Sequence, residues 1–370
     1  MSLLATSLFL KKLMDSKFYH KVSYISIILC TLVIWVHSYN ADLFLAGYDH
    51  SLYWQSLLST AIGQIAVPGF FMLSALLFFR DFDLTLTLTK WYRRFFTLVI
   101  PFCLWNILYY IGYQLLILIS SISDISAMKS LYIPRDVQGI LEIIFLYKFN
   151  PICWFMFQLI LLVIVSPLIY ILLKNAYIAG IYIFLLICFL WLQPTTGWDI
   201  PWLNEDALFY YSLGGYFIMH HTKGVCGVSS MRSKICGICM LMISLAILIL
   251  RDFIGLGGIP TEVVSALNMP LASVILRCTS SIGLWLSIDK KNKVSSPRIA
   301  RLCFFVYMIH FIFVRGINKI GAELLYGSIS AASILFVLMP IIVFVLASMI
   351  ANFMDRHMNL LYRILAGDRV

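Results

Sequence analysis

Ten long apolar stretches dominate the sequence, and most of them approach the length of about 20 residues that an α-helix needs to cross a bilayer. They fall approximately at 22–39, 57–79, 95–118, 153–173, 177–193, 206–220, 235–250, 268–288, 300–318 and 330–353. Hydrophobic residues make up 62% of the chain and charged residues only 12%, whereas a soluble globular protein carries about twice that charged share. The pattern excludes a soluble domain and a disordered chain, and it predicts an all-α, polytopic membrane helix bundle.

Lysine and arginine are distributed unevenly between the segments that connect these stretches. With ten spans both termini lie on one side, and 20 of the 27 basic residues fall on that side against 6 on the other. Because basic residues concentrate in cytoplasmic loops, this predicts that both termini are cytoplasmic. The same asymmetry accounts for the net charge of +10 without a nucleic-acid partner.

The domain organisation is predicted to be simple. No internal repeat or low-complexity tract interrupts the chain, so we expect one membrane-embedded domain over 1–370 with no appended soluble domain. The first apolar run lacks a small-residue cleavage site and is expected to remain as a span. Cys236 and Cys239 form a lone C-x-x-C without the companion ligands of a zinc site, so no metal is expected.

Ionisable side chains inside a bilayer are costly and are therefore functional candidates. His37 and His310 both lie in the outer halves of their predicted spans. Each has two interpretations, a catalytic base or a histidine bonded to a neighbouring helix. Arg277 is predicted close to the middle of its span without a carboxylate partner in the membrane, which favours a role in a ligand site or a water-filled cavity.

A basic cluster precedes the third stretch, in a segment at 80–94 that the sequence predicts as a cytoplasmic loop. Lys90, Arg93 and Arg94 stand there, where a helix start offers free N–H groups to a phosphate. The competing interpretation is ordinary cytoplasmic charge in contact with lipid headgroups. Composition alone favours contact with lipid headgroups over a phosphate site.

Six short motifs, in order, carry a resemblance that extends over nearly the whole chain. They are ISIILCTLVIWVHS with His37, VPGFFMLSA with Ser74, KWYRRFFTLVIPFCLWN, CWFMFQLILLVIVSPLIY, ALFYYSLGGYF, and a late Phe-x-x-Tyr-x-x-His at Phe304, Tyr307 and His310. In these motifs the chain resembles the bacterial membrane-bound acyltransferases of the O-antigen acetylase type, acyltransferase family three.

The resemblance implies an O-acetyltransferase of the bacterial inner membrane. Such an enzyme moves an acyl group, commonly acetyl, from cytoplasmic acetyl-CoA to a hydroxyl of a carbohydrate or lipid-linked glycan during polysaccharide biosynthesis. By this resemblance His37 is the general base, and His310 or Arg277 stabilises the oxyanion. The remaining assignments are CoA-phosphate binding by Lys21, Lys90, Arg93 and Arg94, and substrate binding by Ser74, Trp154 and Tyr307.

Two positions depart from the family pattern. The family carries an arginine eleven residues before the histidine of the first span, where this chain has Ser26, and Lys21 is the nearest upstream cation. Ala75 replaces the glycine that follows the serine of the second span. Two other functions therefore remain open at this point, a multi-pass transporter or glycan translocase and an inactive assembly partner in polysaccharide export.

Overall fold

The computed structural model describes residues 3–45, 52–122, 134, 136–196, 202–226, 230–253, 270–288 and 297–367, and all regular structure within them is helical. The helices are α1 (Leu3–His37), α2 (Ala41–Phe44), α3 (Tyr53–Phe79), η2 (Leu84–Leu86), α4 (Thr87–Arg94), η3 (Phe95–Val99), α5 (Ile100–Ile122), α6 (Val137–Phe145), η5 (Pro151–Cys153), α7 (Trp154–Lys174), α8 (Ala176–Thr196), α9 (Glu205–His220), α10 (Thr222–Cys226), α11 (Met231–Phe253), α13 (Pro270–Ser287), α14 (Pro297–Leu324), α15 (Ile329–His357) and α16 (Asn359–Leu365).

Each of the ten predicted apolar ranges overlaps one of the long helices, so the all-α helix bundle is confirmed. Within the described residues, six helical segments are long and apolar enough to cross a membrane by length and composition. The number of ten spans and the cytoplasmic position of the termini stay predictions. The six segments are Phe18–Phe44, Leu84–Leu115, Pro151–Lys174, Met231–Leu248, Arg301–Leu324 and Ile329–His357.

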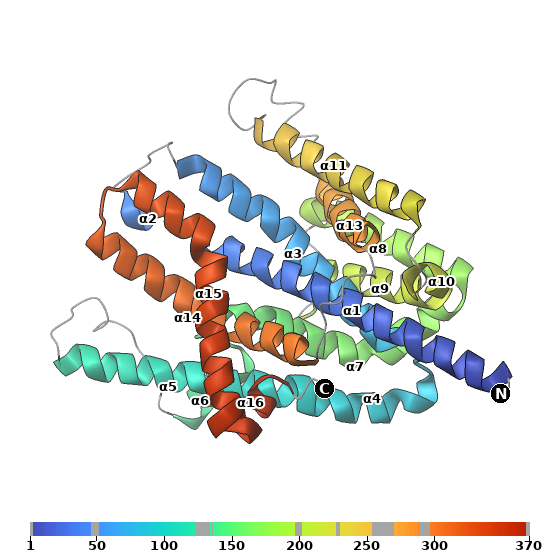
Figure 1. Cartoon of the computed structure of the whole chain (residues 1–370), viewed down its shortest axis with the longest axis horizontal. Coiled ribbons are helices and arrows are strands. Elements are labelled where there is room, and N and C mark those ends of the chain that lie inside the picture. Colours follow the sequence, from blue (N-terminus) through green and yellow to red (C-terminus); the bar gives the residue numbers. More distant parts are fainter. Residues whose placement is uncertain are drawn as a thin grey trace.

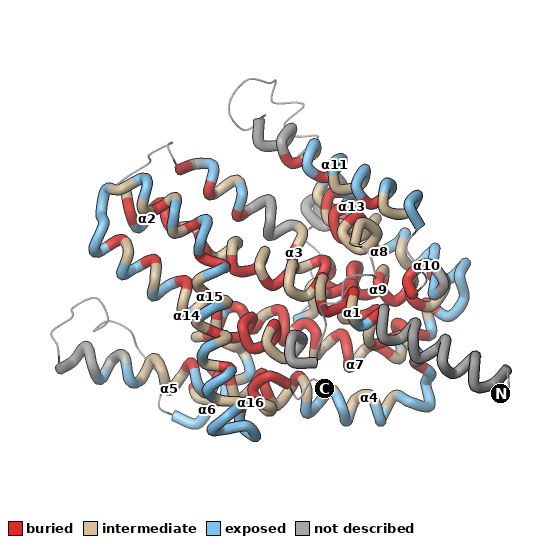
Figure 2. Tube along the Cα trace, viewed as in Figure 1, coloured by how far each residue is buried: buried red, intermediate tan, exposed pale blue. Residues whose placement is uncertain are grey.

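The bundle is built around α1 and α3. Helix α1 packs against α3 and α14, α3 packs against α9, α14 against α15, and α11 against α13 (Figure 1). Buried residues concentrate where α1, α3, α7 and α9 meet, as Figure 2 shows. Leu29, Phe71, Tyr211 and Phe305 belong to this core and are at most 1% exposed.

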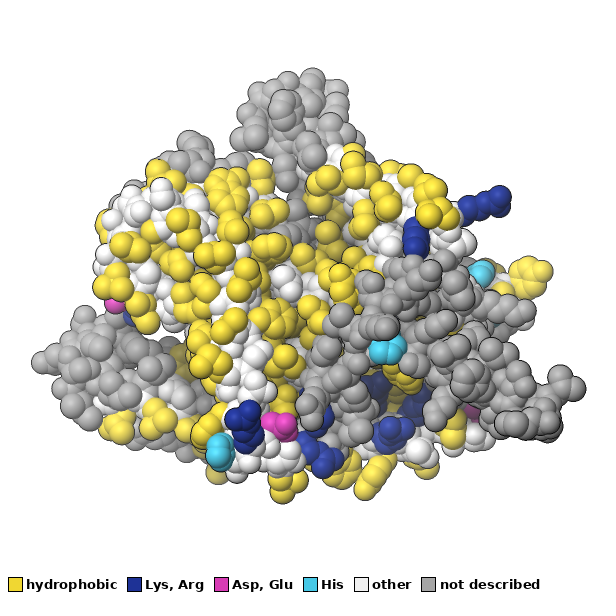
Figure 3. Space-filling model, viewed as in Figure 1, with side chains coloured by type: hydrophobic (Ala, Val, Ile, Leu, Met, Phe, Trp, Pro, Cys, Tyr) yellow, Lys and Arg dark blue, Asp and Glu magenta, His cyan; other side chains and the backbone are white. Residues whose placement is uncertain are grey.

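The outer surface of the bundle is apolar as well. Large side chains such as Ile164, Leu168 and Ile341 are more than half exposed. In Figure 3 hydrophobic side chains cover much of the visible face, while lysine and arginine gather toward its lower and right-hand edges. A surface of this kind is suited to hydrocarbon chains and not to water.

The segment at 80–94 differs from the prediction, because most of it is helical and not a loop. The Asp83 side chain accepts a hydrogen bond of 3.0 Å from the backbone N–H of Thr85 and so starts η2. Helix α4 follows at once and continues through the π-helical turn η3 into α5.

Candidate functional site

Helices α1 and α14 bring two histidines together. His37 is the last residue of α1, and His310 lies midway along α14. Their ring centroids are 5.3 Å apart at an interplanar angle of 40°. His310 is fully buried, and Phe311 packs edge-on against His37 at 5.4 Å. The sequence predicts both histidines at similar depth in the membrane, and in the structure their rings lie next to each other.

The hydrogen bonds of His310 define its tautomer. Its Nδ1 lies 2.6 Å from the backbone oxygen of Tyr307. A carbonyl oxygen can only accept, so Nδ1 carries the hydrogen, and Nε2 of the neutral ring is an acceptor. This Nε2 is buried and has no partner in the described part of the chain. His310 therefore presents a lone pair within the bundle and not an N–H that would stabilise an oxyanion.

Buried side-chain amides hold α1 against α14 close to the histidine pair. Asn318, two turns beyond His310 on α14, donates from Nδ2 to the backbone oxygen of Ser38 over 3.2 Å. Asn40 donates to Asn318 Oδ1 over 3.2 Å and to the backbone oxygen of Ala332 in α15 over 3.1 Å. Because Ser38 follows His37 directly, these bonds set the position of His37 relative to α14.

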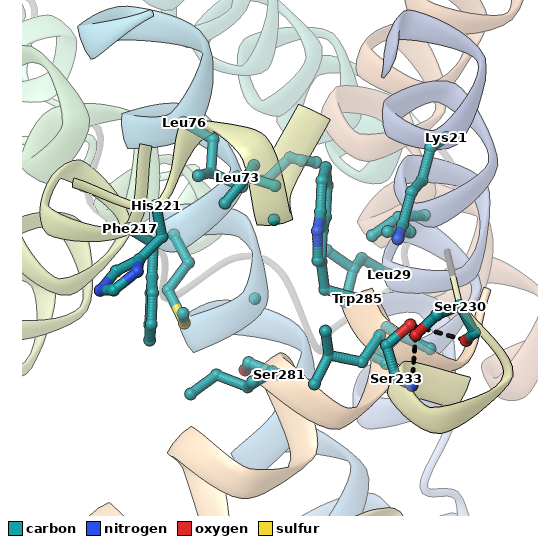
Figure 4. Close-up of a pocket in the computed structure, with 18 residues that line it drawn as sticks. Lys21, Leu29, Leu73, Leu76, Phe217, His221, Ser230, Ser233, Ser281 and Trp285 are labelled. Atoms are coloured by element: carbon teal, nitrogen blue, oxygen red, sulfur yellow. Dashed lines mark hydrogen bonds between the residues drawn. The ribbon is translucent and has the colours of Figure 1, made fainter. Parts of the chain in front are cut away.

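A cavity of about 400 Å³ lies between α1, α3, α9, α10, α11 and α13. Apolar side chains such as Leu29 and Leu73 form most of its walls. Figure 4 shows Lys21 and Trp285 on one side of it and His221 with Phe217 on the other. From Lys21 to Leu29 the cavity follows α1 for about 12 Å, at a rise of about 1.5 Å per residue.

Lys21 is the one lysine or arginine among the described residues that line this cavity. It is 2% exposed, and its Nζ lies 4.5 Å from the centroid of the Trp285 ring. Ser26, one and a half turns further along α1, donates its hydroxyl hydrogen to the backbone oxygen of Val22 over 2.8 Å. Lys21 thus brings a positive charge to a mostly apolar cavity, and Ser26 bonds within its own helix.

The three cations of the predicted phosphate cluster have different surroundings. Lys90 Nζ donates to the backbone oxygens of Phe78 and Arg80 over 2.7 and 3.2 Å, and so caps the end of α3. Arg94 stands over the Phe78 ring at 5.9 Å, whereas Arg93 is exposed. Arg93 is therefore the member of this cluster most open to a ligand.

Arg277 has a carboxylate partner, which corrects the expectation that it has none. Its Nη1 pairs with the Oδ2 of Asp206 in the first turn of α9, and Tyr210 on the same helix lies next to the pair. The Arg277 and Asp206 side chains are 22% and 38% exposed. Asp206 is the first residue of the predicted range 206–220, which is interpreted from the sequence as an apolar span without a carboxylate. Acidic residues are nevertheless common in the first turn of a helix.

The three predicted substrate-binding residues lie in two parts of the bundle. Tyr307 is buried beside His310, with ring centroids 5.8 Å apart, and donates its hydroxyl hydrogen to the backbone oxygen of Ile152 over 2.6 Å. Trp154 begins α7 and packs against Phe71 of α3. Ser74 is half-buried on α3, on the turn whose neighbours Met72 and Leu73 line the cavity.

An apolar helical bundle with polar and ionisable groups in its interior is the fold of a multi-pass membrane protein. The chain belongs to acyltransferase family 3, since the family model, described as an acyltransferase domain, matches residues 19–352. The matched region contains the histidine pair, the cavity and the Arg277–Asp206 pair. No curated protein matches the chain, and no solved structure matches it.

Proposed function

We propose that the protein is an O-acyltransferase of the bacterial inner membrane. It moves an acyl group, which we take to be acetyl, from cytoplasmic acyl-CoA to a hydroxyl of a cell-surface carbohydrate or lipid-linked glycan. The observation that carries the proposal is the pairing of His37 and His310 at 5.3 Å inside a bundle of this family. An imidazole can remove the proton of a hydroxyl near neutral pH, which is what acyl transfer to an alcohol needs.

The cavity supports the direction of transfer. From Lys21 to His37 there are sixteen residues of one helix, a distance of about 24 Å. Lys21 is suited to a CoA phosphate at one end, and the apolar walls are suited to the thin pantetheine arm. The histidine pair lies beyond the other end, so donor and acceptor would approach the reaction centre from opposite sides.

In the proposed reaction His37 accepts the proton of the acceptor hydroxyl while the hydroxyl oxygen attacks the thioester carbonyl carbon. A C–O bond forms, and collapse of the tetrahedral intermediate breaks the C–S bond. His37 then returns the proton to the leaving sulfur and becomes neutral again. His310 offers an acceptor atom beside His37, which favours the transient positive charge on that ring.

The test uses isolated membranes, acetyl-CoA with a labelled acetyl group, and label recovered in lipid-linked or polymeric glycan. The His37→Ala variant is expected to lower the rate by about a hundredfold or more. His357→Ala changes an exposed histidine at the end of α15 and serves as the matched control, with wild-type rates expected. Wild-type turnover by folded His37→Ala protein would refute the base assignment, and label-free glycan with every variant would favour a transporter or an inactive assembly partner.

A further inference from the structure

Three side-chain amides are buried near the end of α1 that carries His37. Asn40, Gln55 and Asn318 are 1%, 0% and 2% exposed, and they come from the segment after α1, from α3 and from α14. We refer to these three residues as the amide cluster. Burying an amide without hydrogen bonds is costly, so each polar atom of the cluster should have a partner.

The orientations of these amides are set by backbone partners. Asn318 Nδ2 donates to the Ser38 carbonyl, and Asn40 Nδ2 donates to the Ala332 carbonyl and to Asn318 Oδ1. Gln55 Oε1 accepts from the backbone N–H of Asn40 over 3.4 Å. Since carbonyls only accept and N–H groups only donate, none of the amides can be reversed without losing a bond.

Two atoms of the cluster remain unpaired once these bonds are made. They are Asn40 Oδ1, an acceptor, and Gln55 Nε2, a donor, and both are buried without a partner in the described residues. Their residues are joined directly by the bond from Asn40 N–H to Gln55 Oε1. The cluster therefore offers one free acceptor and one free donor on neighbouring groups.

The place of these atoms in the bundle connects them to the reaction centre. Asn40 follows His37 by three residues, beyond the end of α1. The cavity with Lys21 lies in the opposite direction along α1. A group bound at the free atoms would thus reach His37 from the side that faces away from the cavity.

We propose that Asn40 and Gln55 form the subsite that binds a hydroxyl of the carbohydrate acceptor. A hydroxyl both donates and accepts, so it can accept from Gln55 Nε2 and donate to Asn40 Oδ1 at once. The cluster supplies no charge of its own, and a neutral polyol matches it better than an ion would. The inference rests on the proposed acyl transfer and names the group that recognises the acceptor.

The test compares Gln55→Met with Gln158→Met in the purified full chain in lipid nanodiscs. Gln158 is the control, since it is also a buried glutamine, 7% exposed on α7, and its amide atoms both have partners, the backbone of Trp202 and of Asn204. The probes are methyl α-D-glucopyranoside, methyl α-D-galactopyranoside and methyl α-L-rhamnopyranoside. Binding is measured by saturation-transfer NMR without acyl donor, and thermal unfolding is measured without probe.

The wild type is expected to bind at least one of these glycosides saturably. Gln55→Met should weaken that binding about tenfold, the loss expected for one hydrogen bond in a water-poor site, while Gln158→Met binds as the wild type does. The two variants are expected to rank in the opposite order when the unfolding temperature is measured. Gln158→Met loses two hydrogen bonds of 3.0 and 2.8 Å, whereas Gln55→Met loses one long bond of 3.4 Å from Asn40 N–H and also removes an unpaired buried donor. Gln158→Met should therefore unfold at the lower temperature of the two.

Two results of the binding experiment would overturn the subsite. One is the absence of binding of all three glycosides to the wild type. The other is wild-type glycoside binding by Gln55→Met, and an unfolding temperature as low as that of Gln158→Met would then show that the amides serve only the fold. Because binding is read without acyl donor, failure of label transfer counts against the proposed function alone. An unchanged acceptor KM in active Gln55→Met protein counts against the subsite alone.

Discussion

The ammonium group of Lys21 lies 4.5 Å from the ring centroid of Trp285, across the wall of a cavity that is otherwise mostly apolar. A cation against an aromatic face is stabilised there by roughly 0.5–2 kcal/mol. If Lys21 also binds a CoA phosphate, as proposed, substitution can separate that role from its packing against Trp285.

Lys21→Met is expected to raise the KM for acetyl-CoA by about tenfold or more, since a hydrogen bond to a charged group is lost. Lys21→Arg should retain most of the affinity, because it keeps the charge and the contact with Trp285. Lys174→Met, at an exposed lysine that ends α7, is the control and should leave this KM unchanged. If Lys21→Met lowers only the unfolding temperature and leaves the donor KM as it was, the packing role alone remains.

His310→Asn tests the acceptor role inferred from the tautomer. Asparagine can place a donor near the position of Nδ1 and keep the bond to the Tyr307 carbonyl, but it has no atom at the position of Nε2. Turnover is expected to fall about tenfold to a hundredfold at an unchanged donor KM. Circular dichroism and unfolding temperature should stay near wild type. Wild-type turnover by this variant would mean that Nε2 takes no part in the reaction.

Sequence predicted the helices well because hydropathy is local. A run of about 20 apolar residues can satisfy its backbone within a bilayer only as a helix, whatever surrounds it. Sequence also identified His37 and His310 as isolated polar groups in such runs. Their separation, 5.3 Å, depends on how α1 packs against α14 and could not be predicted from either run.

The sequence was a poorer guide to side chains whose hydrogen-bond or ion-pair partners lie elsewhere in the chain. Lys90 stands next to Arg93 and Arg94 in the sequence, yet its hydrogen bonds go to backbone oxygens at the end of α3. No motif encodes such a bond, because any residue at the end of α3 supplies the same carbonyl. Arg277 similarly depends on Asp206, 71 residues earlier in the chain, and helix packing alone brings the two together.

The Arg277–Asp206 pair should contribute measurably to stability. Its side chains are 22% and 38% exposed, between the surface and the buried extremes, so removing one partner should cost about 1–3 kcal/mol. Arg277→Met and Asp206→Asn are measured singly and together by unfolding in nanodiscs, and the double variant should lose less than the sum. Lys148→Met breaks a more exposed pair with Glu142, at 49% and 38%, and should cost less than about 1 kcal/mol.

The same variants separate a structural arginine from one that acts on substrate. If Arg277 only ties α13 to α9, both single variants should lower the unfolding temperature and leave the rate per folded molecule unchanged. If Arg277 stabilises the oxyanion, Arg277→Met should lose turnover while Asp206→Asn, which keeps the guanidinium, retains most of it. Additive losses of stability in the double variant would contradict the pairing.

Gly214 sets how closely α9 approaches α3 and with it the shape of the cavity wall. A Cβ at Gly214 would lie 2.5 Å from the backbone oxygen of Met72 and 2.9 Å from its Cα. These are backbone atoms, so one helix would have to move, and Met72 lines the cavity. Gly214→Ala is therefore expected to destabilise the fold by about 1–3 kcal/mol and to weaken acetyl-CoA binding.

Gly316 provides the matched comparison, since it is also helical, in α14, and a Cβ there would meet no described atom within 4 Å apart from the adjacent backbone of its own helix. Gly316→Ala should stabilise the protein by about 0.5–1 kcal/mol through helix propensity alone. The two alanine variants thus carry the same chemical change with opposite expected signs in thermal unfolding. Equal shifts for both, or unaltered acetyl-CoA binding by a destabilised Gly214→Ala protein, would show that the approach of α9 to α3 does not shape the donor site.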